Sequence, residues 1–370
     1  MLLLFYSMNR TGYTDLPLHS GKAPRWLFNR MKLLAREIIS LIVLENGELD
    51  FLEKISDPFW FQAFGAVLGF DWHSSGLTTT VCGAIKEGIK PIEKELNIFV
   101  TGGKGNTSRK TPQEILSKEK YLKINPEKLV YTSKIVAKID NTALQDGYNL
   151  YQHTFIFTKD GKWAVIQQGM NEKNHYARRY HWLSNKIKSM IEDPHAAICC
   201  DEKKEVLNLV TKDSKNAQNR ITLLSKEKPD KLIIEIKKIS HIVLPSHHYV
   251  DIKDINPARL YKIYLKTYEK QPENFEQLLS TQGLGPKSLR ALALISELVY
   301  GDKPSYSDPV RYTFAHGGKD GYPYPVNKEV YDTTIDVLNN IVNKIKVDFT
   351  EKKKALYRLY KFYKSGEKNG

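Results

Sequence analysis

The 370-residue sequence has few cysteines, and those it has are Cys82, Cys199 and Cys200. A small, odd number without Cys-x-x-Cys spacing excludes a disulfide framework and a zinc ribbon. It indicates a reducing compartment, which we expect to be the cytoplasm. The sequence also lacks any apolar run near the roughly 20 residues that a membrane-spanning helix needs, so we expect no membrane partner. Internal repeats and low-complexity stretches are absent as well, which excludes solenoid architectures.

Positive charge, by contrast, is in excess. Lys and Arg number 56 against 42 Asp and Glu, and the formal net charge is +14. Such an excess favours a polyanionic partner, because a protein that neutralises phosphates releases their counterions. Hydrophobic residues make up 41% of the chain, which is enough for most of it to fold. We therefore expect a folded protein that binds nucleic acid.

The N-terminal half combines helical and extended patterns. Apolar spacing and alternation predict helices over 24–44, 48–68, 78–96 and 176–191 and strands over 97–101, 129–140, 151–158 and 162–168. The pair Asp57-Pro58 interrupts the second helix, and Asp160-Gly161 is a hairpin signal between the last two strands. These patterns predict a small, mainly antiparallel sheet with flanking helices.

The C-terminal half is helical, and its composition becomes rich in lysine near residue 201. The sequence as a whole therefore predicts an α+β protein. We expect a candidate catalytic α+β domain over 1–201, a lysine-rich helical linker over 202–239, and an all-helical DNA-binding domain over 240–370.

The most specific local signal follows an amphipathic helix that begins near Phe275. Its glycines allow a tight turn, and Pro286 suits the first position of the next helix. Backbone amides at such a helix N-terminus form a phosphate site. The pattern is similar to the helix-hairpin-helix of DNA repair proteins, which holds the duplex backbone without reading its sequence. An ordinary helix-turn-helix corner is the alternative. The expected DNA contacts are Gly283, Leu284, Gly285, Lys287, Ser288 and Arg290.

Two catalytic hypotheses use acidic residues. A metal-dependent nuclease is favoured, because Asp146 precedes a strand that carries His153 and such sheets often mount Mg²⁺ or Mn²⁺ ligands. The usual second acidic residue is missing there, and His153 alone is also explained as a satisfied sheet histidine. The alternative is a base-excision glycosylase/lyase without a cofactor. In that reaction Lys287 attacks the sugar and Asp308 stabilises the developing cation, although Asp308 is also explained as a helix cap.

Two further basic groups have the composition of nucleic-acid contacts. The loop over 102–112 carries Lys104, Arg109 and Lys110 among glycines and hydroxyls, but it lacks P-loop spacing. Arg178 and Arg179 precede three aromatic rings and have the means to clamp a strand, unless these residues form a core. The expected partner is duplex or branched DNA, with structured RNA left open. A non-catalytic DNA-binding factor is the third hypothesis.

Several phrases carry a resemblance over nearly the full length of the chain. They are DLPLH-GKAPRWL, DPFWFQ, FDWHSSG, GGKG, LQDGY, QQGMN, YARRYHWLS and GLGPKSLRALAL. With them the sequence resembles the archaeal and bacterial family known as domain of unknown function 763. The resemblance implies a soluble prokaryotic protein, and it implies no particular activity.

Overall fold

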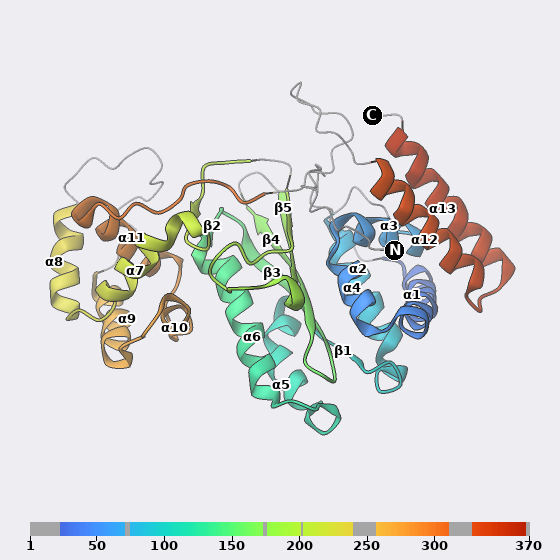
Figure 1. Cartoon of the computed structure of the whole chain (residues 1–370), viewed down its shortest axis with the longest axis horizontal. Coiled ribbons are helices and arrows are strands. Elements are labelled where there is room, and N and C mark those ends of the chain that lie inside the picture. Colours follow the sequence, from blue (N-terminus) through green and yellow to red (C-terminus); the bar gives the residue numbers. More distant parts are fainter. Residues whose placement is uncertain are drawn as a thin grey trace, which may run out of the picture.

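A five-stranded antiparallel sheet at the centre of the molecule confirms the expected α+β class (Figure 1). The computed structural model describes residues 23–70, 75–172, 176–200, 203–239, 257–310 and 328–367. The strand order is β1-β3-β4-β5-β6. Helices cover both faces of the sheet, so that each face contributes to its own hydrophobic core. None of the helices within the described ranges has the length and apolar character to cross a membrane.

The sheet is built on the hairpin that the sequence predicts. Asp160 and Gly161 form the turn, where Gly161 has a φ of 83°, a conformation that favours glycine. The strands of the main sheet are β1 (Ile98–Lys104), β3 (Asn149–Thr158), β4 (Trp163–Asn171), β5 (Tyr176–Leu183) and β6 (Ala197–Cys199). A separate two-stranded sheet pairs β2 (Leu144–Gln145) with β7 (Leu207–Asn208).

The first helical group packs on one face of the sheet. It consists of α1 (Arg25–Asn46), α2 (Glu48–Ser56), α3 (Pro58–Leu68), α4 (Gly76–Ile89), α12 (Lys328–Lys344) and α13 (Phe349–Glu367). The predicted break between α2 and α3 is confirmed, and its cause is a cap. The Asp57 carboxylate accepts hydrogen bonds from the amides of Phe59 and Trp60 at 2.9 and 3.0 Å, so α3 begins there.

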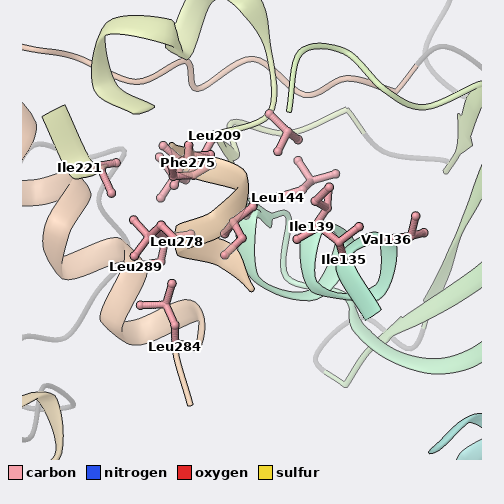
Figure 2. Close-up of a cluster of buried hydrophobic side chains, with 14 of the residues drawn as sticks. Ile135, Val136, Ile139, Leu144, Leu209, Ile221, Phe275, Leu278, Leu284 and Leu289 are labelled. Atoms are coloured by element: carbon pink, nitrogen blue, oxygen red, sulfur yellow. The ribbon is translucent and has the colours of Figure 1, made fainter. Parts of the chain in front are cut away.

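The second helical group packs on the opposite face. It consists of α5 (Thr111–Leu116), α6 (Pro126–Lys138), α7 (Lys215–Leu224), α8 (Pro229–Ile239), α9 (Pro257–Lys270), α10 (Phe275–Leu279) and α11 (Pro286–Tyr300). Figure 2 shows Ile135 and Ile139 in one cluster with Leu278 and Leu289. The hairpin region and the sheet therefore share a single core.

Short helical turns connect these elements. The 3₁₀ turns are η1 (Lys90–Ile92), η2 (Gly105–Lys110), η3 (Glu119–Tyr121), η5 (Ser184–Lys186) and η6 (Lys212–Ser214). The segment η4 (Ile139–Ala143) is a π-helix that extends α6. Such π segments are rare and occur frequently at functional sites.

Two sequence predictions are corrected. The strand expected over 129–140 is mostly α6, because Leu129, Val130, Ile135 and Val136 are buried at helical spacing and Asn125 caps the helix. The helix expected over 176–191 begins as strand β5. Both faces of β5 are buried, so its sequence lacks the alternation of polar and apolar residues that marks a half-exposed strand.

The residues expected to form one C-terminal domain, 240–370, are divided between the two cores. Helices α9 to α11 contribute to the core on the α6 side of the sheet, whereas α12 and α13 pack against α1 and α3. The stretch expected as a linker, 202–239, contains β7, α7 and α8, and most of their apolar residues belong to the core on the α6 side of the sheet. The amphipathic pattern of a helix shows that one of its faces is buried, but the sequence does not show which element covers that face.

The cap at the start of α3 is testable. We expect Asp57→Ala to lower the free energy of unfolding by about 1 kcal/mol, because two amides of the first turn lose their acceptor. Urea unfolding monitored by circular dichroism measures the change. Glu227→Ala is the control, since its carboxylate forms an exposed ion pair with Lys231. Equal stability of the two variants would contradict the cap.

Candidate functional site

A cleft with a volume of about 360 Å³ opens between η2, α6 and β3. The described residues that line it include two cations, Arg109 and Lys134, and no carboxylate. Both cations are exposed. The remaining lining residues are Ser108, Thr111, Pro112, Ser133, Ala137, Leu150, Tyr151, Gln152 and His153. The cleft thus brings the predicted residues Arg109 and His153 together, and its charge suits an anionic ligand.

The glycine-rich loop over 102–112 forms one wall of the cleft. The backbone of this loop lies close to β3 at Gly102. Gly102 has a φ of 83°, and a Cβ atom there would lie 2.1 Å from the carbonyl oxygen of His153. The loop is fixed by an ion pair, in which Lys86 donates to Glu114 at 2.8 Å. Glu114 also accepts from the Gly102 amide at 2.7 Å. Only glycine fits this approach.

The other basic residues of the loop lie beside the cleft. The Lys104 ammonium is 5.8 Å from the ring centroid of Tyr151, and Lys110 is exposed on η2. The predicted basic loop over 102–112 is therefore placed next to the cleft, with Arg109 as its lining cation.

The floor of the cleft is a serine–histidine pair. Ser133 Oγ lies 2.9 Å from His153 Nε2, and His153 Nδ1 lies 2.8 Å from Gln167 Oε1. Ser133 comes from α6, His153 from β3 and Gln167 from β4. Burial lowers the pKa of His153 below its ordinary value, which favours the neutral ring.

Asp140 determines which way this chain of hydrogen bonds runs. Its Oδ2 accepts from Gln167 Nε2 at 2.5 Å and from Trp182 Nε1 at 2.8 Å. The Gln167 amide nitrogen therefore faces Asp140, and its oxygen faces His153. Because that oxygen only accepts, His153 Nδ1 carries the proton, and Nε2 accepts from the Ser133 hydroxyl. His195 Nε2 lies 2.5 Å from the other oxygen of Asp140.

Asp146 and His153 do not form the predicted metal site. The Asp146 carboxylate accepts from Arg178 at 2.9 Å, from the Tyr180 hydroxyl at 2.7 Å and from a backbone amide. The lone pair of His153 faces Ser133. Across the part of the chain that the structure describes, no group of three or more His, Cys, Asp or Glu residues is arranged to hold a metal. The residues therefore do not fit the Mg²⁺ or Mn²⁺ that the sequence favoured.

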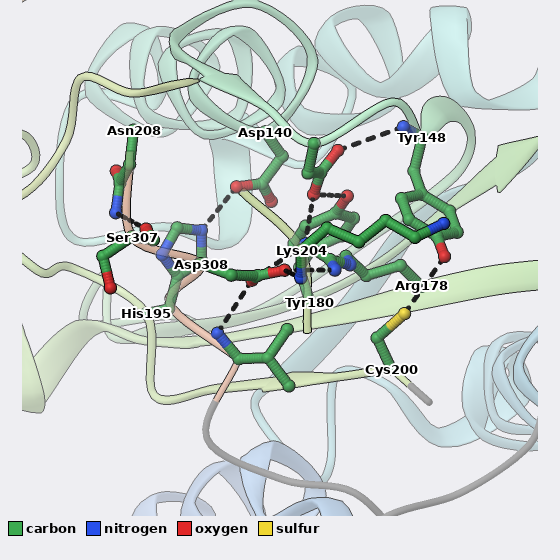
Figure 3. A network of polar contacts seen from close by, with 12 residues as sticks. Asp140, Tyr148, Arg178, Tyr180, His195, Cys200, Lys204, Asn208, Ser307 and Asp308 are labelled. Atoms are coloured by element: carbon green, nitrogen blue, oxygen red, sulfur yellow. Dashed lines mark hydrogen bonds and ion pairs between the residues drawn. The ribbon is translucent and has the colours of Figure 1, made fainter. Parts of the chain in front are cut away.

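The carboxylates of the two rival catalytic hypotheses bind the same guanidinium (Figure 3). Arg178 donates to Asp146 at 2.9 Å and to both oxygens of Asp308 at 3.2 and 2.8 Å. Asp308 also accepts from the Lys204 amide at 3.1 Å. The side chains of Arg178 and Asp308 are fully buried, whereas Lys287 is exposed. A buried, ion-paired carboxylate and an exposed lysine are not the open base pocket that the lyase hypothesis needs.

Arg178 and Arg179 are interior residues, and this corrects their predicted role as a strand clamp. They alternate on β5, so Arg178 points to the α6 side and Arg179 to the α3 side. Arg179 donates to Gln62 at 3.0 Å and lies 4.6 Å from the ring centroid of Phe61. Neither guanidinium has access to a nucleic acid, since both residues are 0% exposed.

The turn between α10 and α11 has its expected glycine geometry. Gly283 has a φ of 90° and is exposed. Leu284 is buried, and its carbonyl oxygen accepts from Lys138. The Gly285 amide donates to Ser288 Oγ at 2.9 Å. Two of the expected phosphate contacts, Leu284 and Ser288, are thus engaged in internal packing and capping.

The basic residues at this turn differ in their exposure. Lys287 is exposed. Arg290 is half-buried and donates to Gln145 at 2.6 Å, and Gln145 in turn donates to the carbonyl oxygen of Pro286 at 2.9 Å. Gly283 and Lys287 therefore remain the outward-facing part of the predicted interface.

A family model described as protein of unknown function (DUF763) matches residues 12–326. The chain belongs to this family. Among curated proteins and among solved structures, nothing matches it.

Three motifs of this DUF763 protein supply partners to the buried polar layers of the sheet. DPFWFQ supplies Gln62, which binds Arg179, and LQDGY supplies Asp146, which binds Arg178. QQGMN begins with Gln167, the partner of His153. The first motif lies largely outside the described residues, as do residues 71–74 of FDWHSSG.

Sequence reasoning missed Ser133, Lys134 and Asp140. They fall in the stretch that was expected to be extended, where no common face joins them to His153. A helical register places Ser133, Lys134 and Ala137 on neighbouring positions of one face, and this face lines the cleft. The capping pair Asn125-Pro126 was the signal for that helix.

The Arg178 ion pairs give a prediction of stability. We expect Arg178→Met to lower the free energy of unfolding by about 3–5 kcal/mol, because it leaves two buried carboxylates without a counter-charge. Denaturant titration measures the loss. Adding Asp146→Asn and Asp308→Asn to Arg178→Met removes those charges, so part of the loss should be recovered. A single variant as stable as the wild type would refute this view.

A buried histidine gives a prediction of pH dependence. Burial and the Arg179 charge hold the pKa of His181 well below its usual value. Below about pH 6.5 the unfolded chain gains a proton at His181 and the folded chain does not, so stability falls as the pH falls. From about pH 7 to about pH 5.5, the wild type should lose about 1 kcal/mol more than His181→Leu. Identical pH profiles in urea unfolding would contradict it.

Proposed function

We propose that this protein binds duplex or branched DNA and processes its phosphodiester backbone. The observation that carries the proposal is the cleft whose lining combines Arg109 and Lys134 with the Ser133–His153 pair. Two exposed cations attract a phosphate, and a hydroxyl beside a neutral imidazole is the arrangement that nucleophilic catalysis uses. The net charge of +14 supports a polyanionic partner.

Helix α6 links the cleft to the α10–α11 turn. One face of α6 lines the cleft through Ser133 and Lys134. The neighbouring face holds the turn, because Lys138 donates to the Leu284 carbonyl oxygen and the Tyr131 hydroxyl donates to Glu276 at 2.9 Å. The cleft and the turn with the exposed Lys287 thus contact the same helix. This arrangement supports a helix-hairpin-helix role for the turn, in which it positions the duplex.

The proposal predicts which charges matter for DNA binding. We expect the double substitution Arg109→Ala/Lys134→Ala to weaken binding to a short labelled duplex at every sequence tested. The dependence of affinity on salt should fall by about two ions, since two phosphate contacts are lost. Fluorescence anisotropy over a salt series measures both quantities.

A matched control removes the same charge elsewhere. Lys231→Ala/Lys238→Ala lies on α8, where both lysines are exposed and form local ion pairs with Glu227 and Glu235, and should bind as the wild type does. If the two double variants bind alike, the cleft is not the DNA site. Incubation with nicked, flapped and damaged duplexes, with Mg²⁺ or with chelator, then separates an enzyme from a binding factor. A borohydride-trapped adduct that Lys287→Ala abolishes would support the lyase instead.

A further inference from the structure

We propose that Ser133 is a nucleophile activated by His153, and that the cleft transfers a phosphoryl group from an anionic phosphate ester to the Ser133 hydroxyl. The identity of the ester as a nucleic-acid phosphodiester rests on the proposed function. The nucleophile itself rests on the geometry of three side chains from three different elements.

The Ser133 hydroxyl is oriented toward the imidazole. A serine or threonine within a helix commonly donates to the carbonyl oxygen four residues earlier. The preceding residue does this, since Thr132 Oγ1 donates to the Lys128 carbonyl oxygen at 2.9 Å. Ser133 Oγ instead lies 2.9 Å from His153 Nε2. Ser133 lines the cleft, and the residue is 3% exposed.

The imidazole is held in the tautomer that accepts a proton from serine. Gln167 Oε1 holds the proton on Nδ1 at 2.8 Å, and Asp140 fixes the direction of the Gln167 amide. Ser133, His153 and Gln167 are thus hydrogen-bonded in the order nucleophile, base and orienting group, an order that activates serine in unrelated folds. Gln167 and Asp140 are positioning residues, because they act through His153.

The charges of the cleft select the substrate class. Arg109 and Lys134 line it, and the described lining residues add no carboxylate. A phosphate ester is attracted to such a site, and its negative oxygens are stabilised by cations as the phosphorus centre reacts.

Ser133, His153 and solvent water supply the groups that take part in the reaction. The bond from Ser133 Oγ to phosphorus forms while the bond from phosphorus to the leaving oxygen breaks. The hydroxyl proton passes to His153 Nε2, and from there to the leaving oxygen, which departs as an alcohol. Solvent water then hydrolyses the phosphoserine ester, with the same nitrogen accepting the proton of the water and returning one to Ser133.

A fluorophosphonate probe tests the nucleophile without nucleic acid. The probe forms a bond from serine oxygen to phosphorus and releases fluoride, and intact-mass and peptide spectrometry locate the adduct. We expect the wild type to be labelled at Ser133, and His153→Gln to be labelled at least about 100-fold more slowly. The exposed Ser117 provides the matched control, and Ser117→Ala should be labelled as the wild type is. A folded wild type without an adduct at Ser133 overturns the proposal.

A second variant, Ser133→Cys, tests the nucleophile by a different reaction. In Ser133→Cys the new thiol lines the cleft beside His153, so we expect iodoacetamide to alkylate it, and alkylation of the three buried native cysteines, measured in the wild type, is the background to subtract. Adding His153→Gln should slow that alkylation at least about 10-fold, because the base that forms the thiolate is lost. Equal alkylation rates with and without His153 overturn the proposal.

The positioning role has its own readout. In Asp140→Asn the Gln167 amide loses the carboxylate that orients it, so the fraction of His153 with its proton on Nδ1 should fall along with probe labelling. Nitrogen NMR of the imidazole reports that fraction, which a loss of stability alone does not change. An unchanged tautomer with reduced labelling would remove Asp140 from the proposal. Labelling of Ser133 without DNA binding would leave the nucleophile standing and refute only the nucleic-acid substrate.

Discussion

The buried guanidinium of Arg178 joins parts of the chain that are far apart in the sequence. It binds Asp146, which precedes β3, and Asp308, which follows α11. Removing one cation and two carboxylates from water costs several kcal/mol for each ion unless hydrogen bonds replace the lost solvent. The Tyr180 hydroxyl and the Lys204 amide supply two of those bonds. The ion pair between Arg178 and Asp308 therefore attaches the region after residue 202 to the sheet. It forms only if Arg178 on β5 points to this face of the sheet.

The same strand orders the floor of the cleft. Arg178, Tyr180 and Trp182 alternate along one face of β5, and Trp182 donates to Asp140 at 2.8 Å. Asp140 in the π-helix orients the Gln167 amide. The amide in turn sets the direction of the hydrogen bonds from Gln167 to His153 and from His153 to Ser133. The site is thus built on a helix and three strands whose side chains are locked by buried partners, which is how a constellation is held in a reactive geometry.

The sequence predicted those elements whose patterning is local. The hairpin at Gly161 and the helix break at Asp57 were recognisable from short-range chemistry, and so was the turn before α11. Helix α6 and strand β5 were mistaken, because buried β5 hides its alternation and α6 alternates by coincidence. Arg109 and His153 were predicted as site residues, and their meeting in one cleft depends on pairing between β1 and β3. Ser133 was out of reach without the correct register of α6.

Acidic and basic side chains near the cleft differ in their exposure: the carboxylates of Asp140 and Asp146 are buried, and the cations Arg109 and Lys134 are exposed. Two acidic side chains behind the cleft, Asp140 and Asp146, are buried and accept hydrogen bonds from Trp182, Gln167 and Arg178. Asp146 is paired with the Arg178 guanidinium and Asp140 is hydrogen-bonded to neutral donors, while Arg109 and Lys134 face solvent. Interactions between charges fall with distance and with the solvent around them, so an approaching polyanion responds mainly to the exposed cations. The cleft thus presents two exposed cations, while the Asp140 carboxylate that holds the Gln167 amide is buried behind it.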